Sequence, residues 1–305
     1  MKKRDDVAAM RARVMAALEE EFVQVRGRSL DLVTRYPDLF GPEGDADFHW
    51  LEQDGAPVSM LITRSQQFES GGRLWTGATV GWVHTLRPMQ GKGLAAALLE
   101  AVAQRFADEG HDFLLLWAHQ HGYYRAQGYH VSDSGLLAEA PVEALDRLLP
   151  GKGFVSTQIS PRDLTPDECA ALDQLALAAA RGGVAFADRP LARIPLPFDS
   201  VSLVRCGKAA APEAYALLGH QADWVTVLEG AGEASALAAL IANAAQGVAN
   251  LRVNARRGSA LHQALEPALR FQPKPLAMYR PLSERFGDDE LFHAAQWSFP
   301  WFDRM

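Results

Sequence analysis

The chain has 305 residues, of which 48% are hydrophobic and 22% charged, so it is long enough for two domains of about 150 residues and too apolar for global disorder. Its formal net charge of −7 argues against a protein that binds the phosphate backbone of nucleic acids. Two cysteines are too few for a disulfide framework or a cysteine-based zinc site.

The sequence has no recognisable targeting or membrane-spanning segment. The first ten residues mix basic and acidic side chains and contain no apolar stretch of the signal-peptide type. The longest uncharged run, Ala234–Leu251, contains Ser, Asn and Gln, which favours a packed helix over a bilayer-spanning one. We therefore expect a soluble, cytoplasmic protein with free thiols at Cys169 and Cys206, without nucleic-acid or membrane partners. Its oligomeric state is left open.

Hydrophobic periodicity predicts helices and strands in mixed order along the first half of the chain. A strand, a glycine-led helix and a buried strand follow one another there, which is the order of a βαβ unit. The predicted segments are a helix with an apolar stripe at Val7, Met10, Val14 and Leu18, strands over Phe48–Glu52, Val58–Thr63 and Ala78–Thr85, a helix that follows Gly91–Gly93 and ends near Glu109–Gly110, and a strand over Phe113–Ala118.

A break in this pattern around Leu149–Gly153 predicts a boundary between domains over residues 1–150 and 151–305. The second half is again predicted to mix α and β structure. Its aromatic end, Phe292–Met305, is expected to dock on the rest of the chain. The predicted segments of the second half are strands over Ser200–Val204, Ala214–Leu218, Trp224–Leu228 and Asn250–Asn254, a helix over Ala234–Ala245, and another helix near Leu261, Leu265 and Leu269.

The segment from Val83 to Ala95 carries the clearest chemical signal. A predicted strand runs into a loop with Gly91 and Gly93, and a helix begins at once. The first turn of a helix has unpaired N–H groups and a partial positive charge, and glycines let a ligand approach the backbone closely. Lys92 adds positive charge. The segment therefore predicts a phosphate-binding cradle, although it has neither the Walker spacing nor the Gly-x-Gly-x-x-Gly spacing of dinucleotide-binding folds.

Two motifs in this region resemble those of the GNAT superfamily of N-acetyltransferases. Gln90, Gly93 and Ala95 match Gln/Arg-x-x-Gly-x-Gly/Ala, the loop that holds the pyrophosphate of acetyl-CoA in that superfamily. After the buried strand, Tyr123–Tyr129 resembles its aromatic-Tyr-x-x-x-Gly-Phe/Tyr motif. The likeness is specific over residues 75–130, and within the superfamily it is greatest to the tandem, Eis-like (enhanced intracellular survival) acetyltransferases.

The resemblance implies an α/β (α+β) protein with two tandem GNAT-like acyl-CoA N-acyltransferase domains, each a mixed sheet flanked by helices, the second one degenerate. It also implies that acetyl-CoA is the acetyl donor and that Tyr124 is the general acid, because a phenol can protonate the departing thiolate. A free strand edge can pair with the amides of pantetheine. A strand N–H can stabilise the negative charge that develops on the thioester oxygen when the amine attacks. The implied cofactor-binding residues are Val83, His84 and Thr85 along the pantetheine arm, and Gln90, Gly91, Lys92, Gly93, Leu94, Ala95 and Ala96 around the pyrophosphate.

Each of these residues also has a structural interpretation. Tyr124 can simply pack its ring, Lys92 can be a solvated lysine, and Tyr123 is expected in the core. The general base is open, because Thr79 stands where some members of the superfamily carry a glutamate. A water chain, an amine that arrives neutral, or one of three histidines can replace that carboxylate. The three histidines are His84, His119 and His121. No metal site is predicted, since His119 and His121 lack further ligands at metal spacing.

The second half has a glycine-containing loop after Trp224–Leu228, but Glu229 and Glu233 flank it and would repel a pyrophosphate. We therefore expect this half to shape the acceptor pocket or the assembly. The end of the chain, Asp303–Met305, is interpreted as a packed tail or as a carboxylate that reaches the first domain. The predicted function is acetyl-CoA-dependent N-acetyl transfer to a primary amine of a small molecule or a lysine, by direct attack in a ternary complex. The alternatives are a non-catalytic acyl-CoA-binding or interaction module and a longer-chain acyltransferase.

Overall fold

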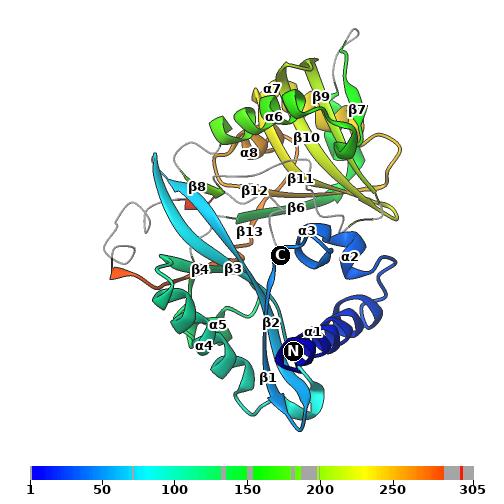
Figure 1. Ribbon diagram of the computed structural model, residues 1–305. Helices are drawn as coiled ribbons and strands as arrows, with labels where there is room; N and C mark the ends of the chain where they lie inside the picture. Colours follow the sequence, from blue (N-terminus) through cyan, green and yellow to red (C-terminus); the bar gives the residue numbers. More distant parts are fainter. Residues whose placement is uncertain are drawn as a thin grey trace.

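The computed structural model describes residues 2–70, 72–131, 135–149, 154–179, 183–186, 198, 200–284 and 296–297. They form two mixed β-sheets, each flanked by helices (Figure 1). This confirms the predicted class of mixed sheets flanked by helices. The predicted boundary at residue 150 stays a prediction, because residues 150–153 lie outside the described part of the chain. None of the described helices is long and apolar enough to cross a lipid bilayer.

The first sheet has the strand order β15-β8-β2-β3-β4-β14-β5, and β1 pairs with β2. Its strands are β1 (Asp47–Gln53), β2 (Ala56–Ser70), β3 (Arg73–Thr85), β4 (Phe113–Trp117), β5 (His130–Val131), β8 (Gly183–Phe186), β14 (Ala277–Pro281) and β15 (Gln296–Trp297). The helical segments of this part are α1 (Lys2–Glu19), the π-helical turn η1 (Glu20–Gln24), α2 (Leu32–Arg35), α3 (Pro37–Phe40), η2 (Arg87–Met89), α4 (Leu94–Asp108) and α5 (His121–Arg125).

The second sheet has the strand order β13-β6-β12-β11-β10-β9-β7. Its strands are β6 (Gly135–Pro141), β7 (Thr157–Ile159), β9 (Ser200–Lys208), β10 (Ala211–Gln221), β11 (Trp224–Gly232), β12 (Asn250–Arg256) and β13 (Gln272–Pro273). Its helical segments are η3 (Val142–Leu148), η4 (Pro161–Asp163), α6 (Pro166–Ala179), α7 (Ala234–Ala244) and α8 (Ala260–Leu265).

Local patterns correctly predicted most of these elements. In α1, Val14 and Leu18 are fully buried as expected, whereas Val7 at the start of the predicted stripe is 56% exposed. The hairpin of β2 and β3 is longer than predicted, since β2 runs on to Ser70. Of the aromatic tail, only Gln296–Trp297 is described, and it pairs with β8. The expected docking of the rest of the tail, including Asp303–Met305, lies outside the described residues.

Each sheet contains strands from the other half of the chain: β8, β14 and β15 lie in the first sheet, and β6 lies in the second. In the first sheet β14 lies between β4 and β5, antiparallel to both, with Met278 opposite Leu116 and Val131. In the second sheet β6 lies between β12 and β13, antiparallel to both, with Leu137 opposite Asn254 and Gln272. The two halves have therefore exchanged equivalent strands, and neither sheet is complete without the other half.

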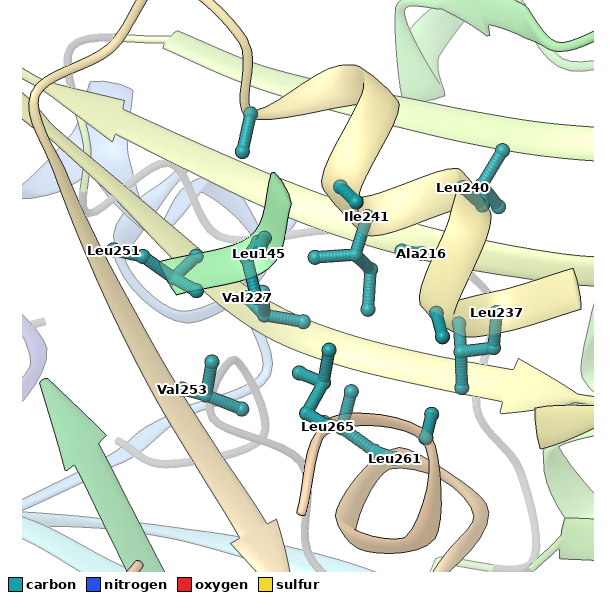
Figure 2. Close-up of a cluster of buried hydrophobic side chains, with 14 of the residues drawn as sticks. Leu145, Ala216, Val227, Leu237, Leu240, Ile241, Leu251, Val253, Leu261 and Leu265 are labelled. Carbon is teal, nitrogen blue, oxygen red and sulfur yellow. The ribbon is translucent and has the colours of Figure 1, made fainter. Parts of the chain in front are cut away.

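The second sheet packs its apolar face against α7 and α8. Figure 2 shows side chains of both helices directed at β11 and β12. Leu237, Leu240 and Ile241 of α7 recur at the three- and four-residue spacing of one helical face, which explains why this helix is held against the sheet. All three are fully buried, as is Leu265 of α8. This half is a closed hydrophobic core.

Candidate functional site

The parallel strands β3 and β4 separate in the middle of the first sheet. They pair only from Gly77–Thr79 to Phe113–Leu115, although β3 continues to Thr85 and β4 to Trp117. Beyond Thr79 the edge of β3 that faced β4 has no pairing with that strand. Backbone groups of this kind can bind an extended ligand that carries amides, as an added strand does. The predicted residues Val83, His84 and Thr85 lie on this edge.

A β-bulge lies in β3 just before these residues. The register with β2 shifts between Met60 and Ile62, and Trp82 has a φ of +50°, which is rare for a bulky residue. The indole is held edge-on by Tyr36 and Phe40, at centroid distances of 5.0 and 5.1 Å. β-Bulges are common next to active sites, where they bend the strand and change the direction of its side chains. This one sets the direction of the strand immediately before His84.

The loop after β3 leads into an uncovered helix N-terminus. Gly93 is the N-cap of α4, with a φ of +75° that disfavours any side chain, and within the described chain no side chain caps this helix. The first intrahelical bond goes from the N–H of Ala97 to the carbonyl of Gly93 at 3.0 Å. The N–H groups of Leu94, Ala95 and Ala96 precede it and are of the kind that binds an anion. Gly91, Lys92 and Gly93 are exposed beside them.

Three predicted cofactor-binding residues have protein partners. Gln90 Nε2 donates to the carbonyl oxygen of Thr85 at 3.0 Å, so this side chain ties the loop to the end of β3. Lys92 Nζ donates to Met89 Sδ at 3.3 Å. Thr85 Oγ1 is also hydrogen bonded to Ser59 Oγ at 2.9 Å. Gln90 therefore stabilises the cradle, and contacts of Gln90 and Lys92 with a phosphate stay predictions.

Tyr124 lies on α5, directly after the separated end of β4. It is half-buried, with its ring edge-on to Tyr129 at 5.8 Å and to Tyr123 at 5.0 Å. Burial raises the pKa of Tyr124 to about 12, so its hydroxyl stays protonated at neutral pH and can act as a proton donor. The prediction that Tyr123 belongs to the core was wrong, because its side chain is 38% exposed. Tyr129, the last residue of the motif, takes the core position and is 1% exposed.

Thr79 is fully buried, and its Oγ1 donates to the carbonyl oxygen of Arg64 at 3.3 Å. Because threonine has no carboxylate, this position cannot supply the general base that a glutamate would provide. Burial lowers the pKa of His84, whose ring lies 6.3 Å from Phe22 of η1. His121 begins α5 one turn before Tyr124, and its Nε2 is buried with no hydrogen-bond partner in the described part of the chain. Among the described residues, no three His, Cys, Asp or Glu side chains gather as a metal site.

The matching place in the second half is filled by the chain itself. There β11 and β12 pair over Trp224–Val227 and then separate, and α7 follows β11 at once. The Glu233 carboxylate caps α7 by accepting the N–H of Ala236 at 2.8 Å. A Cβ on Gly230 would lie 3.0 Å from Leu237 and 3.4 Å from Leu261, both visible in Figure 2. These contacts agree with the expected degenerate second domain.

One residue near Tyr124 was missed by the sequence analysis. Arg280 on β14 forms an ion pair with Glu100 on α4, with Nη1 and Oε2 2.8 Å apart. Its Nε lies 3.5 Å from the position of a Cβ on Gly128, in the turn after α5. Nothing local in the sequence of Ala277–Pro281 indicates that this strand enters the first sheet.

Comparisons with known proteins agree with this geometry. Residues 3–132 match the family model described as "Acetyltransferase (GNAT) domain". A comparison with curated protein sequences gives no match. Several solved structures share the fold at low sequence identity.

A GCN5-related N-acetyltransferase from Anabaena variabilis is 16% identical, with a TM-score of 0.63 over 77% of this chain and 63% of that one. Another from Kribbella flavida is 19% identical, with a TM-score of 0.62 over 88% and 70%. Eis1 from Mycobacterium abscessus is 15% identical, with a TM-score of 0.54 over 77% and 64%. The chain thus spans a little under two thirds of the length of the Anabaena and Mycobacterium proteins.

Proposed function

We propose that the protein transfers an acetyl group from acetyl-CoA to a primary amine, because residues 3–132 match the family model of a GNAT acetyltransferase domain. One observation carries the proposal: the uncapped N-terminus of α4 and Tyr124 both adjoin the opening where β3 and β4 separate. A helix start without a side-chain cap and a protonated phenol at one separated pair of strands support this proposal. Acyl transfer from a thioester that carries a pyrophosphate can use both groups.

In the proposed mechanism the protein first binds and orients the donor. The N–H groups of Leu94, Ala95 and Ala96 bind the pyrophosphate, and the free edge of β3 pairs with the pantetheine amides. An N–H of the strand beyond the Trp82 bulge stabilises negative charge on the thioester oxygen. The amine attacks this carbonyl carbon directly, so no covalent acyl-enzyme is needed.

Tyr124 then supplies the proton that the leaving group needs. The new C–N bond forms, the C–S bond breaks, and Tyr124 Oη donates its proton to the departing thiolate. The nitrogen loses one proton, which balances the proton that Tyr124 later regains. Because Thr79 carries no carboxylate, we assign the removal of that proton to water or to one of the nearby histidines. The acceptor is a small-molecule amine or a lysine.

The first test is calorimetric titration with acetyl-CoA of the wild type, Ala95→Glu and Ala95→Gln. A glutamate in the first turn of α4 favours the helix but repels a pyrophosphate, so folding is retained while binding is lost. We expect the dissociation constant of Ala95→Glu to rise at least about 100-fold above that of the isosteric Ala95→Gln. Equal binding by both variants would remove the cradle from the proposal.

The second test is release of free thiol from acetyl-CoA with a panel of polyamines, aminoglycosides and lysine peptides. Turnover with any of them supports the transferase. Binding without turnover across the panel would instead favour the non-catalytic acyl-CoA-binding module. Parallel assays with longer acyl-CoA donors test whether acetyl is the preferred group.

A further inference from the structure

The strand that the second half contributes to the first sheet lies directly beside the proposed catalytic segment. Strand β14 is hydrogen bonded to β4 on one side and to β5 on the other, and α5 connects those two strands along the chain. Arg280, near the end of β14, is opposite Leu114 of β4. A residue of the second half therefore lies where it can contact both α4 and the turn that follows α5.

Arg280 has an ionic partner in α4 and lies close to the turn after α5. On one side its Nη1 is 2.8 Å from Oε2 of Glu100 in α4, and this hydrogen-bonding, charged partner holds the pKa of Glu100 below its ordinary value. On the other side its Nε lies 3.5 Å from the Cβ position of Gly128. The Arg280 side chain is only 18% exposed, whereas that of Glu100 is 62% exposed. The guanidinium is thus paired with the helix of the cradle on one side and lies beside the turn after α5 on the other.

The turn after α5, which contains Gly128, is connected to Tyr124 in two ways. The N–H of Tyr129, next to Gly128, donates to the carbonyl oxygen of Tyr124 at 3.1 Å. The rings of Tyr124 and Tyr129 also meet edge to face at 5.8 Å. A displacement of this turn would therefore move Tyr124, while a displacement of Glu100 would move α4.

We infer that Arg280 is a positioning residue: it fixes the distance between the cradle on α4 and the proton donor Tyr124. The inference rests on the proposed function. An ion pair with one exposed partner contributes little to stability. Misplacement of a catalytic group by about 1 Å costs about 100-fold in rate. The loss of Arg280 should therefore reduce the rate of transfer far more than it reduces stability or donor binding.

The test compares Arg280→Gln and Glu100→Gln with Arg252→Gln in the full-length protein. Arg252 forms a similar ion pair with Glu139 at 2.7 Å, but within the second sheet, so it is a matched control. We expect Arg280→Gln and Glu100→Gln to lower kcat at least about tenfold, with the Kd of acetyl-CoA changed less than about threefold. Arg252→Gln should leave kcat unchanged. Glu100→Gln removes the same ion pair from a surface position, should Arg280→Gln fail to fold.

A double-mutant cycle separates positioning from a merely structural role. If Arg280 acts through Tyr124, then Arg280→Gln has no further effect on kcat once Tyr124 is Phe. Additive losses in the double mutant would overturn the positioning role, and so would an unchanged kcat in both Arg280→Gln and Glu100→Gln. In either case an active wild type leaves the proposed function intact. A wild type that binds acetyl-CoA but acetylates no amine overturns both.

Discussion

The Glu233 carboxylate accepts the N–H of Ala236 at 2.8 Å and so occupies the N-terminus of α7. The equivalent helix of the first half, α4, begins instead at Gly93, with no side-chain cap within the described chain. The two halves have the same order of strands and helices around these positions, but only one offers its helix N-terminus to a ligand. This contrast supports the proposal that the first half, and not the second, binds the pyrophosphate.

The first prediction is that each chain binds one acetyl-CoA. Titration calorimetry should give a stoichiometry of one for the wild type. It should also give one for Glu233→Gln, because Leu237 and Leu261 still fill the space beside Gly230. The glutamine amide oxygen can still accept the N–H of Ala236, so the cost in folding free energy should stay below the ~1 kcal/mol of a lost cap. A second binding event in either protein would contradict the assignment of a closed second half.

The second prediction concerns Tyr124. Tyr124→Phe should lower kcat by about 10²–10⁴-fold, since the thiolate loses its proton donor, while acetyl-CoA binding is retained. Tyr123→Phe is the matched control, because that exposed neighbour has no part in the proposed mechanism, and its kcat should be unchanged. Equal losses in the two variants would argue for packing instead of proton transfer.

The third prediction is the alkaline limb of the pH profile. Burial raises the pKa of Tyr124 from its ordinary value of 10 to about 12, so the donor stays protonated to higher pH than a free phenol. The kcat of the wild type should therefore show no loss from Tyr124 ionisation below about pH 11. Measurement of kcat from pH 7 upward checks this. A loss centred near pH 10 that disappears in Tyr124→Phe would contradict it.

The fourth prediction follows from the exchanged strands. Expressed alone, residues 1–150 lack β14, so β4 and β5 lose their common partner and expose the positions that pack against Met278, which is fully buried in the whole chain. We expect this fragment to aggregate or to unfold without cooperativity, and to be rescued by co-expression with residues 151–305. Circular dichroism and co-purification of the two fragments measure both effects. A soluble, cooperatively folded 1–150 fragment would contradict the prediction.

The fifth prediction concerns acid stability. His49 is hydrogen bonded through Nε2 to Thr63 Oγ1 at 2.8 Å, and burial lowers its pKa to about 4. Its unfolded-state pKa is near 6.5, so the unfolded chain binds this proton more readily and stability falls as the pH drops from 6.5 to 4. The contribution of His49 is up to about 3 kcal/mol over that window.

Denaturant unfolding of the wild type and His49→Gln at several pH values checks this prediction. The difference in unfolding free energy at pH 8, where the imidazole is neutral in both states, is the reference. Below pH 6.5 the wild type should lose stability faster than the variant. Parallel pH curves for the two proteins would show that His49 does not contribute.

Most of the local elements of this protein could be predicted from the sequence alone, because they depend on neighbouring residues. The apolar spacing along α4 and the glycines at both its ends define that helix without any tertiary information. The order of strand, Gly91–Gly93 and helix likewise indicated an anion cradle, and the Tyr123–Tyr129 motif indicated the proposed acid. Backbone conformation and helix amphipathicity are short-range properties, so they can be read along the chain.

The tertiary structure alone decided which strands pair and which side chains are covered. Nothing in the local pattern of Ala277–Pro281 distinguishes a strand of the second sheet from one between β4 and β5. For the same reason, neither the exposure of Tyr123 nor the proximity of Arg280 to Gly128 could be predicted. Strand pairing is chosen by burial and hydrogen bonding between residues far apart in the chain. The sequence therefore indicated the proposed cradle and tyrosine, and only the fold brought a strand of the second half beside them.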